Sequence, residues 1–214
     1  MLSAFLFLSV QDLGFIHAAD KKIVLLKQAS KENYDTIQAA IDAVAAGEDA
    51  IIQIPAGTYS EPLKISNTSS RTIILKGASA DVSAYSNGGV RSSEETILTG
   101  GIEVNGLLED DSLEINGLTL HGKGINIVGW GAPIISSGSI RIVNNVITNI
   151  TDKSISAIHI NCGSDEYLDT VNLKNNYIDN IGEEGYASNG VYSTLPVRAM
   201  YILSLIHISE PTRH

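Results

Sequence analysis

The sequence predicts an all-β chain, a parallel β-helix or solenoid, with one α-helix near its N-terminal side. Three observations support this prediction. One early segment has the spacing of an amphipathic helix, the segments after it alternate in polarity as short strands do, and two of those segments repeat each other.

The helix is predicted to begin at Asp35 and to run for about three turns. Asp35 can accept hydrogen bonds from the first-turn amides, and Gln38 can reach back as in a capping box. Gly47 follows where a residue in the left-handed region would end the helix. A helix of this length is marginal alone, so its apolar face must dock on the rest of the chain. That face comprises Ile37, Ile41, Val44 and Ala45.

The internal repeat is the strongest indication of the fold. The segment 139–150 aligns without a gap on 170–181, at an offset of 31 residues, and a looser copy begins at Ser112. Each copy has a strand, a two-residue polar corner and a second strand, and 156–160 supplies a third strand. Copies stacked about 4.8 Å apart would satisfy one another's backbone donors. We therefore expect Ile140 to lie beside Val171 on a parallel strand.

Asparagine pairs occupy the corners of the two best copies. Asn tolerates the left-handed region because its short amide can bond locally. Stacked copies place Asn144 beside Asn175 and Asn145 beside Asn176. We expect the side-chain amides to bond along the stack as a structural asparagine ladder, in preference to a catalytic role.

The two ends of the chain are assigned to segments outside the domain. An apolar run at 2–10, too short to span a bilayer, precedes small residues at 16–20 that suit cleavage, so 1–19 is a predicted signal peptide. No Lys or Arg precedes the run, which leaves a misplaced start codon or a buried first strand as alternatives. The segment from Leu203 to Arg213 resembles a translated sequencing adapter. We assign 203–214 to this artefact, the alternative being an amphipathic strand, and 20–202 to an incomplete β-helix domain truncated at its C-terminus.

Charge and cysteine content restrict the partners. The formal net charge of −10 predicts a surface that repels nucleic acid and anionic lipid. Beyond the leader, no segment is apolar enough to cross a membrane, so no membrane insertion is expected. The single cysteine, Cys162, cannot form an internal disulfide. With the leader, these features predict a secreted or cell-surface protein, with a bacterial source favoured.

The segment 36–44, followed by 52–59, resembles the opening of pectin-lyase-like proteins, a superfamily that includes pectinesterases, polygalacturonase-type hydrolases and phage tailspikes. The likeness covers about Tyr34 to Leu75. It implies a right-handed parallel β-helix whose N-terminal helix caps one end of the stack. It also implies a protein that binds or cleaves polysaccharide as a lyase, esterase or hydrolase. The superfamily's catalytic signatures are missing: Leu168 precedes Asp169 and Thr170 where pectinesterases carry Gln-Asp-Thr. A non-catalytic surface or adhesin-type β-helix protein is the alternative.

An acidic group after the third strand of the repeat supplies the candidate catalytic residues. Asp165, Glu166 and Asp169 flank the longest connection of the repeat, and Lys174 lies on the strand that follows. Asp165 and Glu166 can offer oxygen ligands to calcium, the one cofactor suggested. Asp165 and Asp169 can act as an acid and base pair, and Lys174 can remove a proton from a uronic sugar. The alternative is a solvated acidic turn.

Two further sets of residues can reach a ligand from a loop or a strand. Trp130, the only tryptophan, lies between two glycines and either stacks on a sugar face or fills a gap between strands. His159 alternates with isoleucines and should face outward. The acidic segment 109–111 is expected to be a charged turn.

Overall fold

The computed structural model describes residues 22–28, 30–66, 71–84, 88–91, 94–105, 111–129, 139–150, 157–162, 170–181, 191–193 and 199–203. These residues form one helix and eighteen strands, which are arranged in three sheets. The predicted all-β class is therefore confirmed. The predicted signal peptide lies outside the described residues, as does the segment 204–214. Leu203, the first residue assigned to the adapter, is the last residue of a strand.

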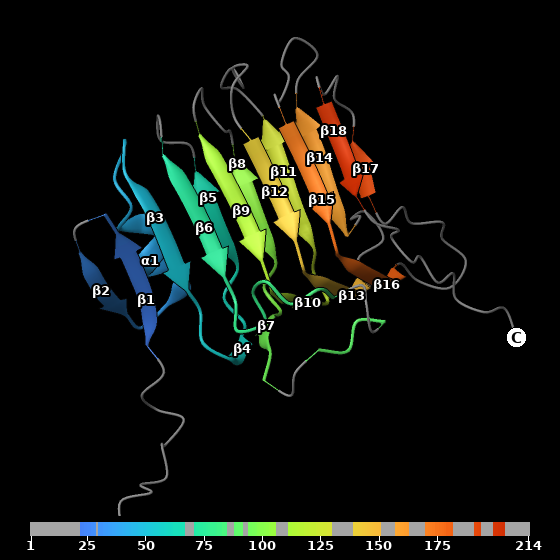
Figure 1. Ribbon diagram of the computed structural model, residues 1–214, viewed down its shortest axis with the longest axis horizontal. Helices are drawn as coiled ribbons and strands as arrows, with labels where there is room; N and C mark the ends of the chain where they lie inside the picture. Colours follow the sequence, from blue (N-terminus) through green and yellow to red (C-terminus); the bar gives the residue numbers. More distant parts are fainter. Residues whose placement is uncertain are drawn as a thin grey trace, which may run out of the picture.

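The first sheet has eight strands in the order β18-β15-β12-β9-β6-β3-β1-β2 and faces the viewer in Figure 1. It opens with two strands that the sequence analysis does not predict, β1 (Ile23–Lys27) and β2 (Lys31–Tyr34), which pair in antiparallel fashion. The remaining strands of this sheet are β3 (Asp49–Gln53), β6 (Thr72–Lys76), β9 (Ser112–Asn116), β12 (Ser139–Val143), β15 (Thr170–Lys174) and β18 (Ala199–Leu203).

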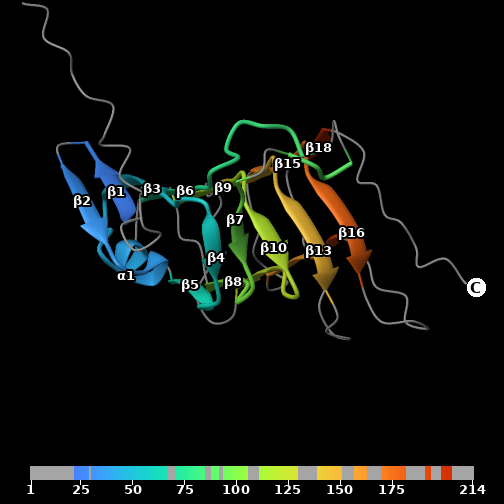
Figure 2. The same cartoon turned by 90° about the horizontal axis from the view of Figure 1, so that it is seen from below.

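The second and third sheets have five strands each, in the orders β16-β13-β10-β7-β4 and β17-β14-β11-β8-β5. The second sheet runs along the lower side of Figure 1 and faces the viewer in Figure 2. Its strands are β4 (Gly57–Tyr59), β7 (Thr96–Leu98), β10 (Thr119–His121), β13 (Val146–Ile150) and β16 (Tyr177–Ile181). Those of the third sheet are β5 (Leu63–Ser66), β8 (Ile102–Asn105), β11 (Ile125–Gly129), β14 (Ile158–Cys162) and β17 (Val191–Ser193).

From β3 onward, the chain visits the three sheets in turn, and each strand pairs in parallel with the strand three places further on. We call three consecutive strands, one from each sheet, a triplet. Ile140 of β12 lies opposite Val171 of β15 and opposite Leu113 of β9. The expected parallel pairing of the repeated segments is thus confirmed, in the register that the ungapped alignment predicts.

The helix α1 (Ile37–Asp42) is shorter than predicted and begins two residues later. Its N-cap is Thr36, whose Oγ1 accepts a 3.1 Å bond from the amide of Ala39, so the expectation for Asp35 was wrong. A threonine hydroxyl can satisfy a first-turn amide as a carboxylate does, and the two adjacent candidates are indistinguishable by residue type. Gln38 does not reach back to the cap: its side chain bonds the backbone of Lys64 instead.

The apolar face of the helix is nevertheless nearly as predicted. Ile37, Ile41 and Val44 are buried, and helix α1 contacts β1, β2, β3 and β5, whereas Ala45 is exposed. Gly47 has a left-handed φ of 76°, but it lies beyond the helix end, which Ala43 caps. The docked face supplies the tertiary support that so short a helix requires.

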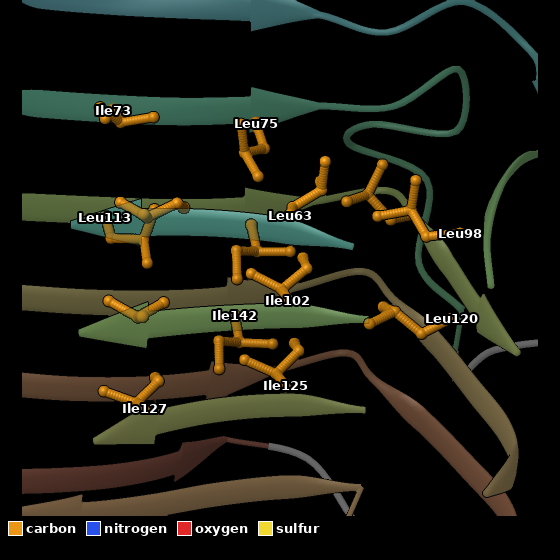
Figure 3. Close-up of a cluster of buried hydrophobic side chains, with 14 of the residues drawn as sticks. Leu63, Ile73, Leu75, Leu98, Ile102, Leu113, Leu120, Ile125, Ile127 and Ile142 are labelled. Atoms are coloured by element: carbon orange, nitrogen blue, oxygen red, sulfur yellow. The ribbon is translucent and has the colours of Figure 1, made fainter. Parts of the chain in front are cut away.

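The core lies between the three sheets and is built from alternate residues of each strand. Branched aliphatic side chains from all three sheets point toward one another in Figure 3. Ile142 of the first sheet, Leu120 of the second and Ile125 of the third are all fully buried. Because parallel register repeats these positions in every triplet, equivalent side chains form continuous apolar rows through the interior.

Substitutions at two adjacent residues of β12 should distinguish its buried face from its outer face. We expect Ile142→Ala to lower the free energy of unfolding by about 2–5 kcal/mol, because it removes buried methyl groups and leaves a cavity. Arg141→Ala, one residue away on the same strand, should lower the free energy of unfolding by about 1 kcal/mol or less. The Arg141 side chain is 55% exposed, and the substitution removes only its ion pair with Glu114. Urea unfolding followed by circular dichroism measures both. Equal losses would contradict the assignment of inner and outer faces.

Candidate functional site

Most of the site residues predicted from the sequence lie outside the described residues. This applies to Asp165, Glu166, Asp169 and Trp130. Lys174 is described: it is the last residue of β15, and it is exposed. The described residues contain no group of three or more His, Cys, Asp or Glu side chains that could hold a metal ion.

The described strands on either side of these residues adjoin one another. Gly129, at the end of β11, lies opposite Cys162, at the end of β14. The strands that resume the chain, β12 and β15, are also paired, with Ser139 opposite Thr170. The described strand ends that flank Trp130 and the acidic group in the sequence therefore lie side by side, in the third sheet and in the first.

The third sheet presents a row of polar side chains on its outer face, which we call the outer row. It comprises Lys64 of β5, Glu103 of β8, Asn126 of β11 and His159 of β14. Each lies opposite the next in the parallel register. The residues on either side of each are buried, so the row faces away from the core. Successive members are spaced by the distance between strands, about 4.8 Å.

Neighbouring groups hold parts of the outer row in place. The carboxylate of Glu103 accepts a 2.8 Å bond from the Asn105 side chain on the same strand. The amide of Lys64 donates to the Gln38 side chain, which donates in turn to the Lys64 carbonyl, at 2.8 and 2.9 Å. These bonds tie the first strand of the row to helix α1 and order the carboxylate of the second.

Asn126 carries an unused acceptor in the middle of the row. Its Oδ1 atom is shielded from solvent and has no hydrogen-bond partner among the described residues. His159, half-buried between two buried isoleucines, faces outward as predicted. A buried acceptor without a donor is costly.

The outer row combines groups suited to hydroxyl-rich ligands. A carboxylate accepts hydrogen bonds, an amide both donates and accepts, and an imidazole does either according to its protonation. Glu103 and His159 are separated by one strand, hence by about 9.6 Å, twice the spacing between strands. Only Lys64 is a cation, so the row is not organised to neutralise a run of negative charges.

The asparagine corners connect the first sheet to the second, on a different side from the outer row. Asn145 donates to the Asn176 Oδ1 atom from both its backbone and its side chain, at 3.0 and 3.1 Å. Asn175 donates to the Asn144 side chain at 3.3 Å. Asn144 and Asn175 adopt left-handed φ values of 58° and 57°. These bonds join the residues that the repeat predicts to be stacked, and their role is to satisfy buried backbone.

The expectation that 109–111 is a charged turn was wrong for Asp111. Its side chain is 2% exposed, and its Oδ1 atom accepts a 3.0 Å bond from the amide of Arg71. The Arg71 guanidinium donates to the carbonyls of Val44 and Ser66. Burial lowers the pKa of Arg71 and the nearby Asp111 carboxylate opposes that shift. A single acidic residue before a strand carries no sequence sign of such a partner forty residues earlier.

Comparison of the chain with protein-family models, with curated proteins and with solved structures gives no match. Among the described residues, no helix has the length and apolar character needed to cross a membrane. The function is therefore argued from the residues themselves.

Loss of one corner asparagine should destabilise the chain more than loss of an exposed one. Asn176 is 4% exposed. Its side chain accepts a hydrogen bond from the backbone amide of Asn145 and donates one to the carbonyl of Ile142. We expect Asn176→Ala to lower the free energy of unfolding by about 2–4 kcal/mol, because two buried backbone groups lose their partner. Asn33→Ala on the exposed face of β2 is the matched control and should change it by about 0.5 kcal/mol or less. Thermal unfolding of both variants tests this, and a cost for Asn176→Ala no larger than the control's would refute it.

Proposed function

We propose that the chain is a right-handed parallel β-helix of the pectin-lyase-like kind, secreted or held at the cell surface. The support is the pairing of every strand from β3 onward with the strand three places further on, in parallel. A helix docked against the first strands and the resemblance of segments 36–44 and 52–59 to that superfamily agree with the proposal. Its handedness rests on the resemblance.

The protein binds polysaccharide along the outer face of the third sheet. The observation that carries this proposal is the outer row, in which four polar side chains on adjacent strands lie in register. An extended polymer repeats its hydroxyl groups along one direction, and stacked parallel strands repeat side chains along one direction at a fixed spacing.

Cleavage of the bound polymer is a second step that the same residues can support. Glu103 can act as an acid or a base and His159 can donate or accept a proton. Lys174 is exposed at the end of β15, in the first sheet. Lyase, esterase and hydrolase chemistry all remain compatible with these groups. The missing catalytic signatures favour the alternative, a non-catalytic surface or adhesin-type protein in which the β-helix is a spacer or recognition surface.

We expect the outer row to carry polymer binding. Glu103→Gln combined with His159→Ala should weaken binding about tenfold or more, because two hydrogen bonds worth about 1 kcal/mol each are lost. Calorimetric titration with polygalacturonate and, separately, with a neutral β-glucan measures the loss and shows which polymer is preferred. Arg141→Ala, on the outer face of the first sheet, is the matched control and should bind as the wild type does.

Two outcomes would count against the binding proposal. One is unchanged affinity of the double variant under conditions where circular dichroism shows it folded. The other is an absence of binding by the wild-type chain to either polymer, which would favour the spacer alternative. Product release from a bound polymer, followed by reducing-sugar or ultraviolet assay, separates a binding protein from an enzyme.

Calcium is proposed as an accessory ion held by Asp165 and Glu166. We expect Asp165→Ala together with Asp169→Ala to abolish any calcium-dependent part of polygalacturonate binding, because carboxylate oxygens are the ligands that calcium prefers. The measurement is calorimetric titration with and without a chelator. Glu94→Ala, which removes an exposed carboxylate two residues before β7, is the control. If the calcium dependence of binding survives in the double variant, Asp165 and Asp169 do not belong to the calcium site.

A further inference from the structure

An open groove lies on the first sheet, near the end of the sheet that β1 and β2 form. Its residues come mainly from β1, β3 and β6, which are neighbours in the sheet and lie side by side in Figure 1. The groove has a volume of about 760 Å³. Small-molecule sites occupy about 300–1,000 Å³. We call it the first-sheet groove, and its lining includes Leu26, Lys27, Glu48, Asp49, Ile51 and Ile74.

The floor of the first-sheet groove is aliphatic. Leu26 of β1 lies opposite Ile51 of β3, and Ile51 lies opposite Ile74 of β6. All three side chains are half-buried, and they form a row across adjacent strands about 4.8 Å apart. The same row continues with polar side chains, since Glu114 and then Arg141 follow Ile74 in register. The apolar surface is thus confined to the groove, where an apolar ligand group would be shielded from water.

One carboxylate beside this floor is exposed. Asp49 precedes Ile51 by two residues on the outer face of β3. Its Oδ1 atom accepts a 3.2 Å bond from the backbone amide of Thr72, on the paired strand β6. This bond fixes the carboxylate over the start of both strands. The position lies about 6.6 Å along the strand from Ile51, two residues at the usual rise of a β-strand.

The one basic residue among the described lining residues is already engaged elsewhere. The Lys27 ammonium lies 3.0 Å from the Glu48 carboxylate and 4.0 Å from that of Glu32, and it donates to the Ala43 carbonyl at 3.0 Å. The hydrogen bond between them raises the pKa of Lys27 and lowers the pKa of Glu48, so both groups are charged at neutral pH. Lys27 therefore compensates one of two nearby carboxylates, and the charge of Asp49 remains.

We propose that the first-sheet groove binds a small amphipathic cation, an organic ammonium ion with a short aliphatic chain. The aliphatic chain lies across Leu26, Ile51 and Ile74, and the ammonium group lies beside Asp49. An anionic ligand of the same shape is repelled by the surplus of carboxylates, and a neutral one gains no ionic attraction. This site is on a different sheet from the outer row, so it does not depend on whether the chain binds polysaccharide.

Titration with hexylammonium, followed by nuclear magnetic resonance of the backbone amides, tests the proposal. The amides of Asp49, Ile51 and Thr72 should shift, and those of β14 in the third sheet should not. Hexanoate and hexanol have the same chain with a negative charge or none, and methylammonium has the charge without the chain. We expect each of these three to bind about fivefold more weakly than hexylammonium, or weaker still.

Two variants separate the roles of the charge and the floor. Asp49→Asn, whose amide oxygen can still accept the Thr72 bond, should weaken hexylammonium binding about threefold and leave hexanol binding unchanged. Ile51→Thr, which keeps a β-branched side chain in the strand, should weaken the binding of both about threefold. Glu94→Gln and Ile97→Thr make the same chemical changes outside the groove, at an exposed and a half-buried position, and should bind as the wild type does.

Three results would overturn the proposal. Equal affinity for hexylammonium, hexanol and hexanoate would show that charge plays no part. Shifts that do not include the amides of β3 and β6 would place the ligand elsewhere. Wild-type affinity in Asp49→Asn would exclude this carboxylate as the partner of the ammonium group. If circular dichroism shows that Ile51→Thr does not fold, Ile74→Thr supplies the same comparison for the floor.

Discussion

Parallel backbone pairing between strands three places apart is the constraint on which the rest of the structure depends. It aligns the buried positions of Ile140 and Val171, and it equally aligns the outward positions of Glu103, Asn126 and His159. Inner and outer rows are thus two results of one register, because side chains alternate faces along every strand. A shift by one residue in a single strand would place apolar side chains on the outer face and polar ones in the core.

The corners must turn the chain without leaving backbone groups unpaired, and asparagine meets both demands. Asn144 and Asn175 occupy the left-handed region, while Asn145 and Asn176 are buried and bond the backbone of the neighbouring triplet. Where Gly117 stands in place of the first asparagine, the backbone of Ala80, in the connection between β6 and β7, lies against the corner. Side-chain amides and the connection between β6 and β7 therefore both supply hydrogen-bond partners to polar groups at the corners.

The sequence alone predicts the parallel pairing and the corner asparagines because both repeat at a fixed offset. The docked face of the helix also follows from the spacing of Ile37 and Ile41. The strands β1 and β2 escape prediction because they belong to no repeat, and their antiparallel pairing depends on contacts with β3. Long-range polar pairs such as Arg71 with Asp111, and Arg91 with Leu118, are also missed, since no local pattern marks a partner so distant in the chain.

The candidate site was foreseen only in part: Trp130 and Asp165 follow strands of the third sheet in the sequence, but the outer row was not predicted as a site. A row of side chains that crosses several strands cannot be identified until the pairing register of the strands is known.

The connection between β6 and β7 has a wider consequence. Nineteen residues are accommodated between β6 and β7 while the register on both sides stays intact, so the architecture can acquire new chain at its corners without disturbing its strands. New recognition surfaces can thus evolve there, independently of the core.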